Sequence, residues 1–542
     1  MKWILKVKKR RNATQILVLL VSIILFGCSD KGDENRGLPN ESYLALNEDN
    51  SHFYISRSAD KMSVDGLKEM VDHYVKGTQV KQLVFCTNSM CTSYASEVWD
   101  PIWHDYDDPD LIKKEVTVKY QMQWQSNALL LHKKGIDPYK VWIDYSREIG
   151  ISPWLSMRMN DIHYVDDTTS FIHSSFWKEN PQLRRVPDHF SRWTDRAFDY
   201  GQKEVREHHM ALIRELFERY DFDGLELDWM RFAYHFRPGH EEEGIPLLTE
   251  FMTEVRHLAD DYAIRRGHPI RIGVRVPSRP WTAKGLGVDA VTWAKRGLVD
   301  MLVVTPFWAS IETDMPIEKW KELLGDSPVI LAAGLETLLR PYPAASTELH
   351  NNAETALGAA VSFLHRGADL VYLFNHMDVV ATTDHPEYYL TKHDFTRILQ
   401  NAGALETATT YTRRHVVTYS DTWAPGEPEI YALPAWCHQD TTAVFKIHIG
   451  PRPNAGEVRV FVGLGEEGNQ DTTPLEVRVN GELCAASESA PPKHIHPLVS
   501  TIAGFDVPLS VAKDGYNKVE VNSSAADQGQ IVWMEIEVIP KK

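Results

Sequence analysis

Cysteine is scarce in this chain: its 542 residues include only five, and none of them forms a metal-ligand pair of the CxxC kind. No HExxH motif, Gly-rich phosphate loop or Ser nucleophile elbow is evident. Positive charge is also limited, with 58 Lys and Arg against 75 Asp and Glu and a formal net charge of −17. These absences argue against a resident metal, a bound cofactor and nucleic acid as a partner.

The apolar run near the N-terminus, residues 16–26, is too short to cross a bilayer, and it follows six Lys and Arg residues as a secretion signal does. It ends in Leu25-Phe26-Gly27-Cys28, which resembles a bacterial lipobox. The resemblance implies cleavage before Cys28 and attachment of lipid to its thiol, while an ordinary signal peptide with an incidental Cys is the alternative. Cleavage removes six positive charges and no acid, which takes the net charge from −17 to −23.

The residues after Cys28 are polar and rich in acid, which resembles the surface-export signal of Bacteroidetes-type lipoproteins. We therefore expect a signal peptide over residues 1–27, an acidic tether over 28–50, and an exported protein held at the outer membrane by its lipid alone. In an exported protein the other four cysteines could form disulfides or remain free buried thiols. The two conceivable bridges are Cys86–Cys91 and Cys437–Cys484.

Strand-like apolar runs alternate with helical patterns across residues 51–405, which predicts a (β/α)8 barrel. The expected strands are residues 53–56, 82–86, 153–159, 224–228, 270–276, 301–306, 329–334 and 370–375. One of the helices between them is expected to start at Asp137, as the N-cap, with Pro138 at its first position.

From about residue 410 the pattern changes to short β-rich segments, which predicts a jelly-roll-like β-sandwich over residues 410–542. Asn480-Gly481 between two alternating runs is typical of a hairpin turn. Residues 505–509 with 515–517 resemble the last strands of accessory domains in carbohydrate-active enzymes. Such a domain could bind glycan or brace the barrel, and both interpretations stay open.

The segment Asp-Phe-Asp-Gly-Leu-Glu-Leu-Asp-Trp-Met-Arg-Phe at residues 221–232 is the most informative in the chain. In a strand, Glu226 and Asp228 share one face. Two buried acids destabilise a strand unless they have partners or a function. One interpretation is an ion pair with Arg231 or Arg275. The other is a catalytic carboxylate at the C-terminal end of a barrel strand, where barrel enzymes carry their chemistry.

Polar and aromatic residues follow nearly every expected strand, as a sugar site requires. Glycoside hydrolysis needs two carboxyl groups beside the scissile bond, and Asp228 and Glu336, on strands across the barrel, are the predicted catalytic pair. The predicted substrate-binding residues are Arg158, Asn160, Asp161, Glu226, Trp229, Arg231, Arg275, Trp308, Asn375 and His376.

Four arginines of this set and its neighbourhood, Arg158, Arg231, Arg275 and Arg279, would make the cleft locally positive. Arginine forks bind carboxylate or sulfate groups bidentately, so an anionic glycan is one hypothesis for the substrate. The alternative is that these arginines pair with the acids of the same region.

The barrel segment resembles the glycoside-hydrolase-like barrels of bacterial lipoproteins in the family-10-like group. The matching stretches are residues 223–228, 297–300 and 367–372. The first is also similar to the DGxDxDxE strand of family 18 chitinases, but Met230 stands where their catalytic Glu would be. True family 10 xylanases end strand 4 with Asn-Glu, which is Leu227-Asp228 here, while Glu336 fits their nucleophile position.

Three functions follow from these observations. The first is a lipid-anchored glycoside hydrolase that acts on a carbohydrate by carboxylate acid–base chemistry. The second is a non-catalytic surface glycan-binding lipoprotein that does not depend on Asp228 or Glu336. The third is a metal-dependent hydrolase with ligands from His163, His235 and His376, although the barrel segment has no His-x-His spacing.

Overall fold

The computed structural model describes residues 43–106, 118–345, 347, 349–378, 390–468, 475–523 and 529–541. The predicted signal peptide, Cys28 and the first part of the predicted tether lie outside the described residues. No helix in the described ranges is long and apolar enough to cross a membrane.

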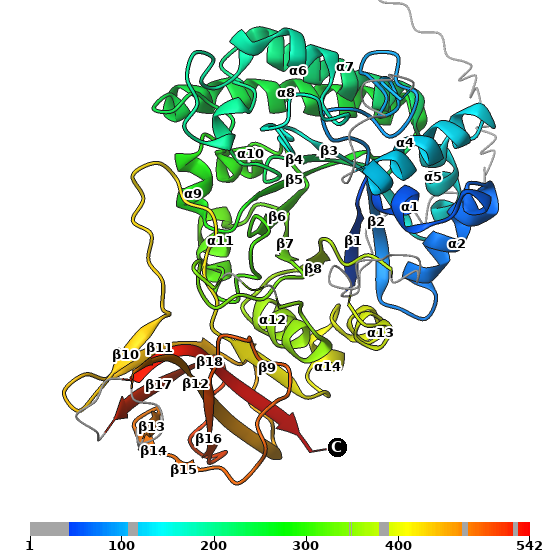
Figure 1. Cartoon of the computed structure of the whole chain (residues 1–542). Coiled ribbons are helices and arrows are strands. Elements are labelled where there is room, and N and C mark those ends of the chain that lie inside the picture. The colour runs from blue at the N-terminus through cyan, green and yellow to red at the C-terminus, as the bar shows by residue number, and fades with distance from the viewer. Residues whose placement is uncertain are drawn as a thin grey trace, which may run out of the picture. The chain divides into compact units, whose positions relative to one another are not determined.

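Eight parallel strands, β1 to β8, pair in sequence order and close into a barrel with helices around it (Figure 1). This confirms the predicted (β/α)8 fold. The strands are buried on both faces, as expected for parallel strands under helices. Their bounds are β1 Leu44–Glu48, β2 Val80–Cys86, β3 Ser152–Arg158, β4 Gly224–Asp228, β5 Arg271–Pro277, β6 Met301–Thr305, β7 Ile330–Leu335 and β8 Leu370–Leu373.

The helix expected at Asp137 begins at that residue. Asp137 caps α5, because its side chain accepts hydrogen bonds from the backbone N–H groups of Tyr139 and Lys140. The bounds are α1 His52–Ser56, α2 Val64–Val75, α4 Val118–Lys133, α5 Pro138–Glu148, α6 Ser175–Glu179, α7 Lys203–Arg219, α8 Glu241–Arg266, α9 Pro280–Gly285, α10 Ala290–Lys295, α11 Ile317–Leu324, α12 Ala353–His365, α13 Lys392–Asn401 and α14 Leu405–Ala408.

The first strand is not where the sequence pattern placed it. Residues 53–56 form part of helix α1, and the barrel begins with β1 at Leu44–Glu48, inside the predicted tether. A short run of three apolar residues, Phe53-Tyr54-Ile55, fits a buried helix as well as a strand, so periodicity alone does not separate the two. The pairing of β1 with both β2 and β8 closes the barrel. Asp49 and Asn50, rather than the residues after Ser56, therefore follow the first strand.

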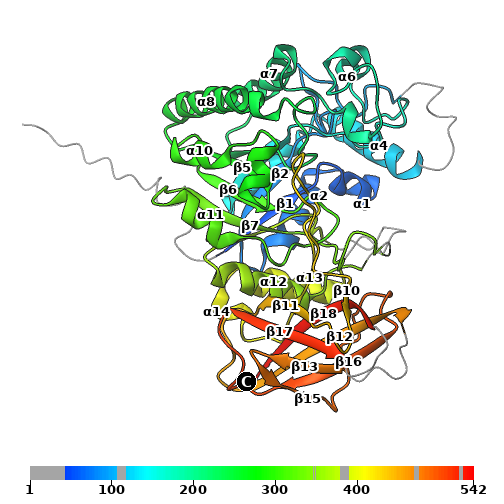
Figure 2. The ribbon, with the colours of Figure 1, turned by 90° about the vertical axis from the view of Figure 1, so that its left-hand side faces the viewer.

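The C-terminal part forms two antiparallel sheets, which confirms the predicted β-sandwich (Figure 2). Asn480 and Gly481 link β13 to β14 with φ values of 51° and 95°, the left-handed turn that this dipeptide favours. The sheet strands are β9 Arg413–Val416, β10 Ala435–Cys437, β11 Ala443–His448, β12 Gly456–Gly468, β13 Leu475–Val479, β14 Glu482–Leu483, β15 Ala485–Ala486, β16 Thr501–Val507, β17 Tyr516–Ser523 and β18 Gly529–Pro540.

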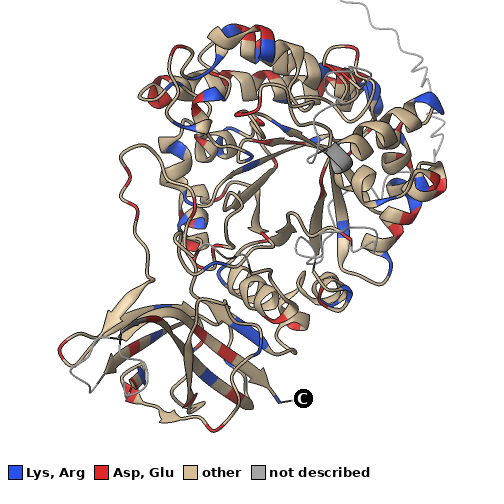
Figure 3. Cartoon of the chain, viewed as in Figure 1, with Lys and Arg blue, Asp and Glu red and all other residues tan. Residues whose placement is uncertain are grey.

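Acidic and basic side chains intermix on the outer helices, whereas the barrel strands are mostly uncharged (Figure 3). The charges inside the barrel are therefore exceptions that need partners. Four cysteines of the described residues, Cys86, Cys91, Cys437 and Cys484, are buried free thiols, so neither of the two conceivable disulfides is formed.

Candidate active site

The register of the barrel places three charged residues side by side at the ends of neighbouring strands. Arg158 of β3 lies opposite Asp228 of β4, and Asp228 lies opposite Arg275 of β5. Residues in register on parallel strands share a face, so the charges alternate around the end of the barrel. Nη1 of Arg275 donates to both oxygens of Asp228, at 3.2 and 2.9 Å.

Both oxygens of the Asp228 carboxylate accept hydrogen bonds from protein donors. Besides Arg275, the backbone N–H groups of Met230 and Arg231 donate to its Oδ1, at 3.0 and 2.8 Å. Asp228 is 1% exposed. The ion pair that the sequence offered as the alternative interpretation of Asp228 is thus present, with Arg275 as the partner.

Glu336, directly after β7, shares that arginine. Nη2 of Arg275 lies 3.4 Å from its Oε1, and Nδ2 of Asn375 donates to its Oε2 at 3.0 Å. Burial raises the pKa of Glu336 to about 7, against the opposing charges of Arg275 and Arg231. A carboxyl group with this pKa exchanges protons near neutral pH, which is what acid–base catalysis requires.

Asn375 holds Glu336 from a strained backbone position. Its φ is 61°, in the left-handed region that Asn tolerates better than most residues. Phe232, next to Arg231, has a φ of 63°. Conformations of this kind cost on the order of 1–3 kcal/mol each and tend to gather at functional sites.

A pocket of about 260 Å³ opens beside Glu336. Of the predicted site residues, it brings together Glu336, Arg231, Trp308 and Asn375. This volume is slightly below the smallest usual volume of small-molecule sites, which is about 300 Å³. The other lining residues, which the sequence analysis missed, are Ser51, His52, Ile55, Thr337, Leu338, His350 and Met377.

Arg231 lines this pocket and keeps unsatisfied hydrogen-bond donors. Its Nη2 lies 2.9 Å from Nε2 of His163, and its guanidinium lies over the ring of Phe307 with Cζ 5.6 Å from the centroid. Its Nε and Nη1 have no hydrogen-bond partner, and it forms no ion pair within the described part of the chain. Burial, followed by the charge of Arg158, lowers its pKa to about 10, so it remains a cation at neutral pH.

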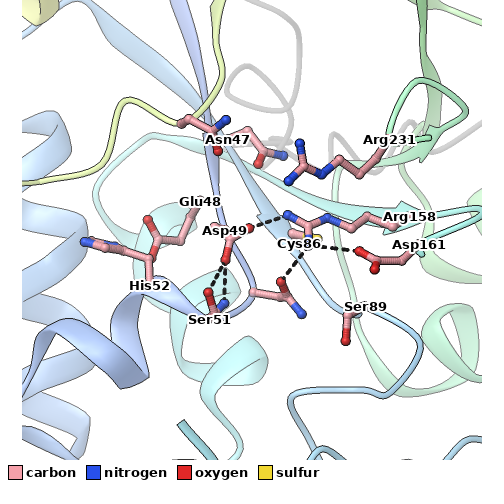
Figure 4. A network of polar contacts seen from close by, with 12 residues as sticks. Asn47, Glu48, Asp49, Ser51, His52, Cys86, Ser89, Arg158, Asp161 and Arg231 are labelled. Atoms are coloured by element: carbon pink, nitrogen blue, oxygen red, sulfur yellow. Dashed lines mark hydrogen bonds and ion pairs between the residues drawn. The ribbon is translucent and has the colours of Figure 1, made fainter. Parts of the chain in front are cut away.

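The remaining arginines have acidic partners. Figure 4 shows Arg158 between Asp49 and Asp161; its Nη2 bonds Asp49 and its Nη1 lies 3.3 Å from Oδ2 of Asp161. Oδ1 of Asn50 accepts from Nη1 of Arg158 at 3.1 Å. Asp49 and Asn50 follow β1, so the misplaced first strand concealed them. The polar cluster 47–50 after Leu44-Ala45-Leu46 was the available signal.

Several predicted substrate-binding residues do not line this pocket. Asn160 donates to the carbonyls of Phe198 and Tyr234, so it connects the loop after β3 with the two segments that contain those residues. Glu226 lies one layer deeper than Asp228, where its Oε1 accepts from Ser156 and Tyr372 at 2.8 and 2.9 Å. Burial, followed by the charge of Asp228, raises the pKa of Glu226 above its usual range.

Trp229 is a correction to the sequence analysis. Its ring is fully buried and packs edge-on against Tyr200, His235 and Phe251, so no face is left for a sugar. A Trp after a strand and a Trp in the core look alike in sequence.

Each of the three histidines proposed as metal ligands is bonded to a different protein group. His163 bonds Asp161 at 2.8 Å, His235 bonds the carbonyl of Trp229, and His376 bonds the carbonyl of Phe374. The chain does contain one His-x-His pair, His494 and His496, whose Nε2 atoms bond the carbonyls of His350 and Thr347. No group of three or more His, Cys, Asp or Glu residues is arranged to hold a metal in the ranges that the structure covers.

No protein-family model matches the sequence, and no curated protein matches it either. Among solved structures, it is similar to α-L-fucosidase isoenzyme 2 from Paenibacillus thiaminolyticus, at 14% identity over 66% of this chain and 49% of that one, with a TM-score of 0.38. A chitinase from Bacillus thuringiensis matches at 9% identity over 90% and 98% of the two chains, with a TM-score of 0.37.

A glucanotransferase from Paenibacillus sp. matches at 12% identity over 94% of this chain and 58% of that one, with a TM-score of 0.30. This chain thus spans only 58% and 49% of the glucanotransferase and of fucosidase isoenzyme 2. At these identities and scores the function must be argued from the residues of this chain.

Proposed function

We propose that this protein is a glycoside hydrolase whose proton donor is Glu336. The observation that carries the proposal is a buried carboxyl group with a pKa of about 7 at the end of a barrel strand, lining a pocket with Trp308, Arg231 and Asn375. Trp308 supplies a flat ring for a sugar face, and the polar side chains supply partners for hydroxyl groups.

The proposed reaction transfers one proton to the leaving oxygen and adds one water molecule to the anomeric carbon. Protonated Glu336 gives its proton to the glycosidic oxygen as the bond from that oxygen to the anomeric carbon breaks. The water oxygen adds to the anomeric carbon, and a second carboxylate takes the proton that water loses. Asp228, on the other side of the Arg275 guanidinium from Glu336, is our candidate for that carboxylate.

Activity is tested with the soluble form, residues 30–542, on a panel of neutral, uronate-containing and sulfated polysaccharides. Released reducing ends are the measurement. The proposal expects release from at least one glycan.

We further propose that the glycan is anionic. Arg158 pairs with Asp49 and Asp161, Arg275 with Asp228 and Glu336, and Arg279 with Glu427. Arg231 alone among these arginines has no acidic partner in the described segments, yet it is buried and lines the pocket. A cation held by His163 and aromatic rings, with the N–H groups of Nε and Nη1 unused, suits a carboxylate or sulfate group.

Replacing Arg231 by Met is expected to remove the preference for the charged glycan, with kcat/KM on that substrate falling about 100-fold, because a charge-assisted pair is worth about 2–3 kcal/mol. Activity on the desulfated or carboxyl-reduced glycan should fall much less. Arg231→Lys should recover part of the preference. Equal losses on both substrates would show that Arg231 does not recognise the negative charge of the glycan.

A non-catalytic glycan-binding lipoprotein is the second candidate. One observation favours it: both oxygens of Asp228 are occupied by protein donors, and Glu336 is the only acid in the lining of the pocket described above. Binding of a glycan without any release of reducing ends, unaltered in Glu336→Gln, would establish this candidate instead.

The proposed location rests on the sequence around Cys28. Expressed in a bacterium that processes lipoproteins, the full chain should incorporate labelled palmitate and fractionate with membranes. Cys28→Ala should abolish both. Palmitate incorporation that survives this replacement would contradict lipid attachment at Cys28.

A further inference from the structure

A long segment of the sandwich domain reaches the pocket end of the barrel. Residues 417–434, between β9 and β10, leave the sheets, extend to α9 of the barrel, and return (Figures 1 and 2). We call this segment the arm. At its far end, Ala424 packs with Met230 and Ala233 from the loop after β4 and with Leu286, which directly follows α9.

The arm holds one barrel loop through a single carboxylate. Oδ1 of Asp421 accepts from the backbone N–H of Phe307, and Oδ2 accepts from Trp308 and Ala309, all at 2.8 Å. Three successive N–H groups thus converge on one side chain. Such charge-assisted bonds to a loop are stronger than neutral ones and fix its conformation.

Two further contacts fix the arm on the barrel independently of Asp421. Nη2 of Arg279 donates to the carbonyl of Thr422, and its guanidinium lies over the ring of Trp423 with Cζ 3.7 Å from the centroid. The carboxylate of Glu427 accepts from Nε1 of Trp281 at 2.8 Å and from Oγ1 of Thr282 at 2.9 Å. The arm is therefore a fixed support at Asp421.

The loop that Asp421 holds, between β6 and α11, carries Trp308 into the lining of the pocket beside Arg231 and Glu336. We propose that the arm belongs to the active site: Asp421 is a positioning residue that sets the Trp308 ring as the sugar platform. The sandwich domain then contributes to substrate affinity without touching the substrate. This inference rests on the proposed function of the pocket.

Asp421→Asn tests it, because an amide keeps one acceptor oxygen but turns an N–H₂ group toward one set of backbone donors. KM for the glycan should rise about fivefold with kcat nearly unchanged, the scale of one aromatic stacking contact. The Kd of the inactive Glu336→Gln protein for the same glycan should rise equally when Asp421→Asn is added.

The decisive comparison is a double-mutant cycle with Trp308→Ala. If Asp421 acts through Trp308, the double variant binds glycan no more weakly than Trp308→Ala alone. Additive losses would overturn the inference. Should Asp421→Asn melt at a much lower temperature, Glu427→Gln serves as the second arm variant, and the same lack of additivity with Trp308→Ala is expected.

Tyr516→Phe is the matched control for general loosening of the sandwich against the barrel. The Tyr516 hydroxyl donates to Asp314 at 2.6 Å, away from the lining of the pocket. This variant should leave KM and Kd unchanged. If the wild-type protein binds glycan without hydrolysing it and Asp421→Asn still weakens binding through Trp308, the proposed catalysis fails while the role of the arm stands.

Discussion

Replacing Glu336 by Gln is expected to lower kcat about 1,000-fold, the scale of losing one positioned proton donor. The amide can still accept a hydrogen bond from Asn375, so the pocket keeps its shape. Glycan affinity should therefore change little. Reducing ends released per unit time, together with the Kd from calorimetry, check the two halves of this expectation.

The pH profile of the wild-type protein follows from the same carboxyl group. Glu336 must carry its proton to act as the acid, and its pKa is about 7. Activity on the glycan should therefore fall as pH rises through about 7. A profile without an alkaline decline near this pH would assign the proton transfer to a different group.

Loss of Glu336 should not destabilise the fold at alkaline pH. Its folded pKa of about 7 lies above the ordinary value of 4.5, so the native state binds this proton more tightly than the unfolded chain does. The resulting stability is present below 4.5 and is lost as pH rises to about 7, a change of up to about 3 kcal/mol. At pH 8 the Gln variant should be at least as stable as wild type.

Glu535→Gln is the matched control for this substitution. Glu535 of β18 is also fully buried, also has a pKa raised by burial, and also pairs with an arginine, Arg414. It lies in the sandwich sheets, away from the pocket. This variant should keep wild-type kcat at a temperature at which it is folded, and a large loss of activity would show that the Glu336 effect is not specific.

Asp228→Asn is expected to have the largest effect on stability, lowering the free energy of unfolding by about 3–5 kcal/mol. The change leaves the fully buried Arg275 with Glu336 as its remaining acidic partner, at 3.4 Å. Thermal melting beside Glu535→Gln, which breaks an equally buried pair, measures this cost. A melting temperature equal to that of wild type would show that the Asp228–Arg275 pair contributes little.

The same variant separates two roles of Asp228 in catalysis. With Asp228 neutral, the charge of Arg275 acts on Glu336 alone and should lower the pKa of Glu336. If Asp228 only tunes Glu336, the alkaline limb of the profile moves to lower pH and activity returns in acid. If Asp228 also takes the proton from water, kcat falls at every pH, and this is the result we expect.

Strong local signals in the sequence located most of the fold. The alternation of Leu225 and Leu227 with Glu226 and Asp228 identified a barrel strand with acids on one face, and the Asn480-Gly481 turn identified a hairpin. Weak local signals did not identify the first strand of the barrel. Residues 53–56 form a buried helix, and the five residues of β1 became a strand because β2 and β8 lie on either side.

The sequence by itself determined the barrel, the sandwich and a set of acids, arginines and indoles near the strand ends. Only the tertiary structure decided which of these are free to act, because hydrogen bonds and burial depend on residues distant in the chain. Register with β5 places Arg275 beside Asp228. Burial raises the pKa of Glu336 against the charge of Arg275, and core packing leaves no face of Trp229 for a sugar. The bonds from residues 307–309 to Asp421 join segments more than 100 positions apart, which no local pattern encodes.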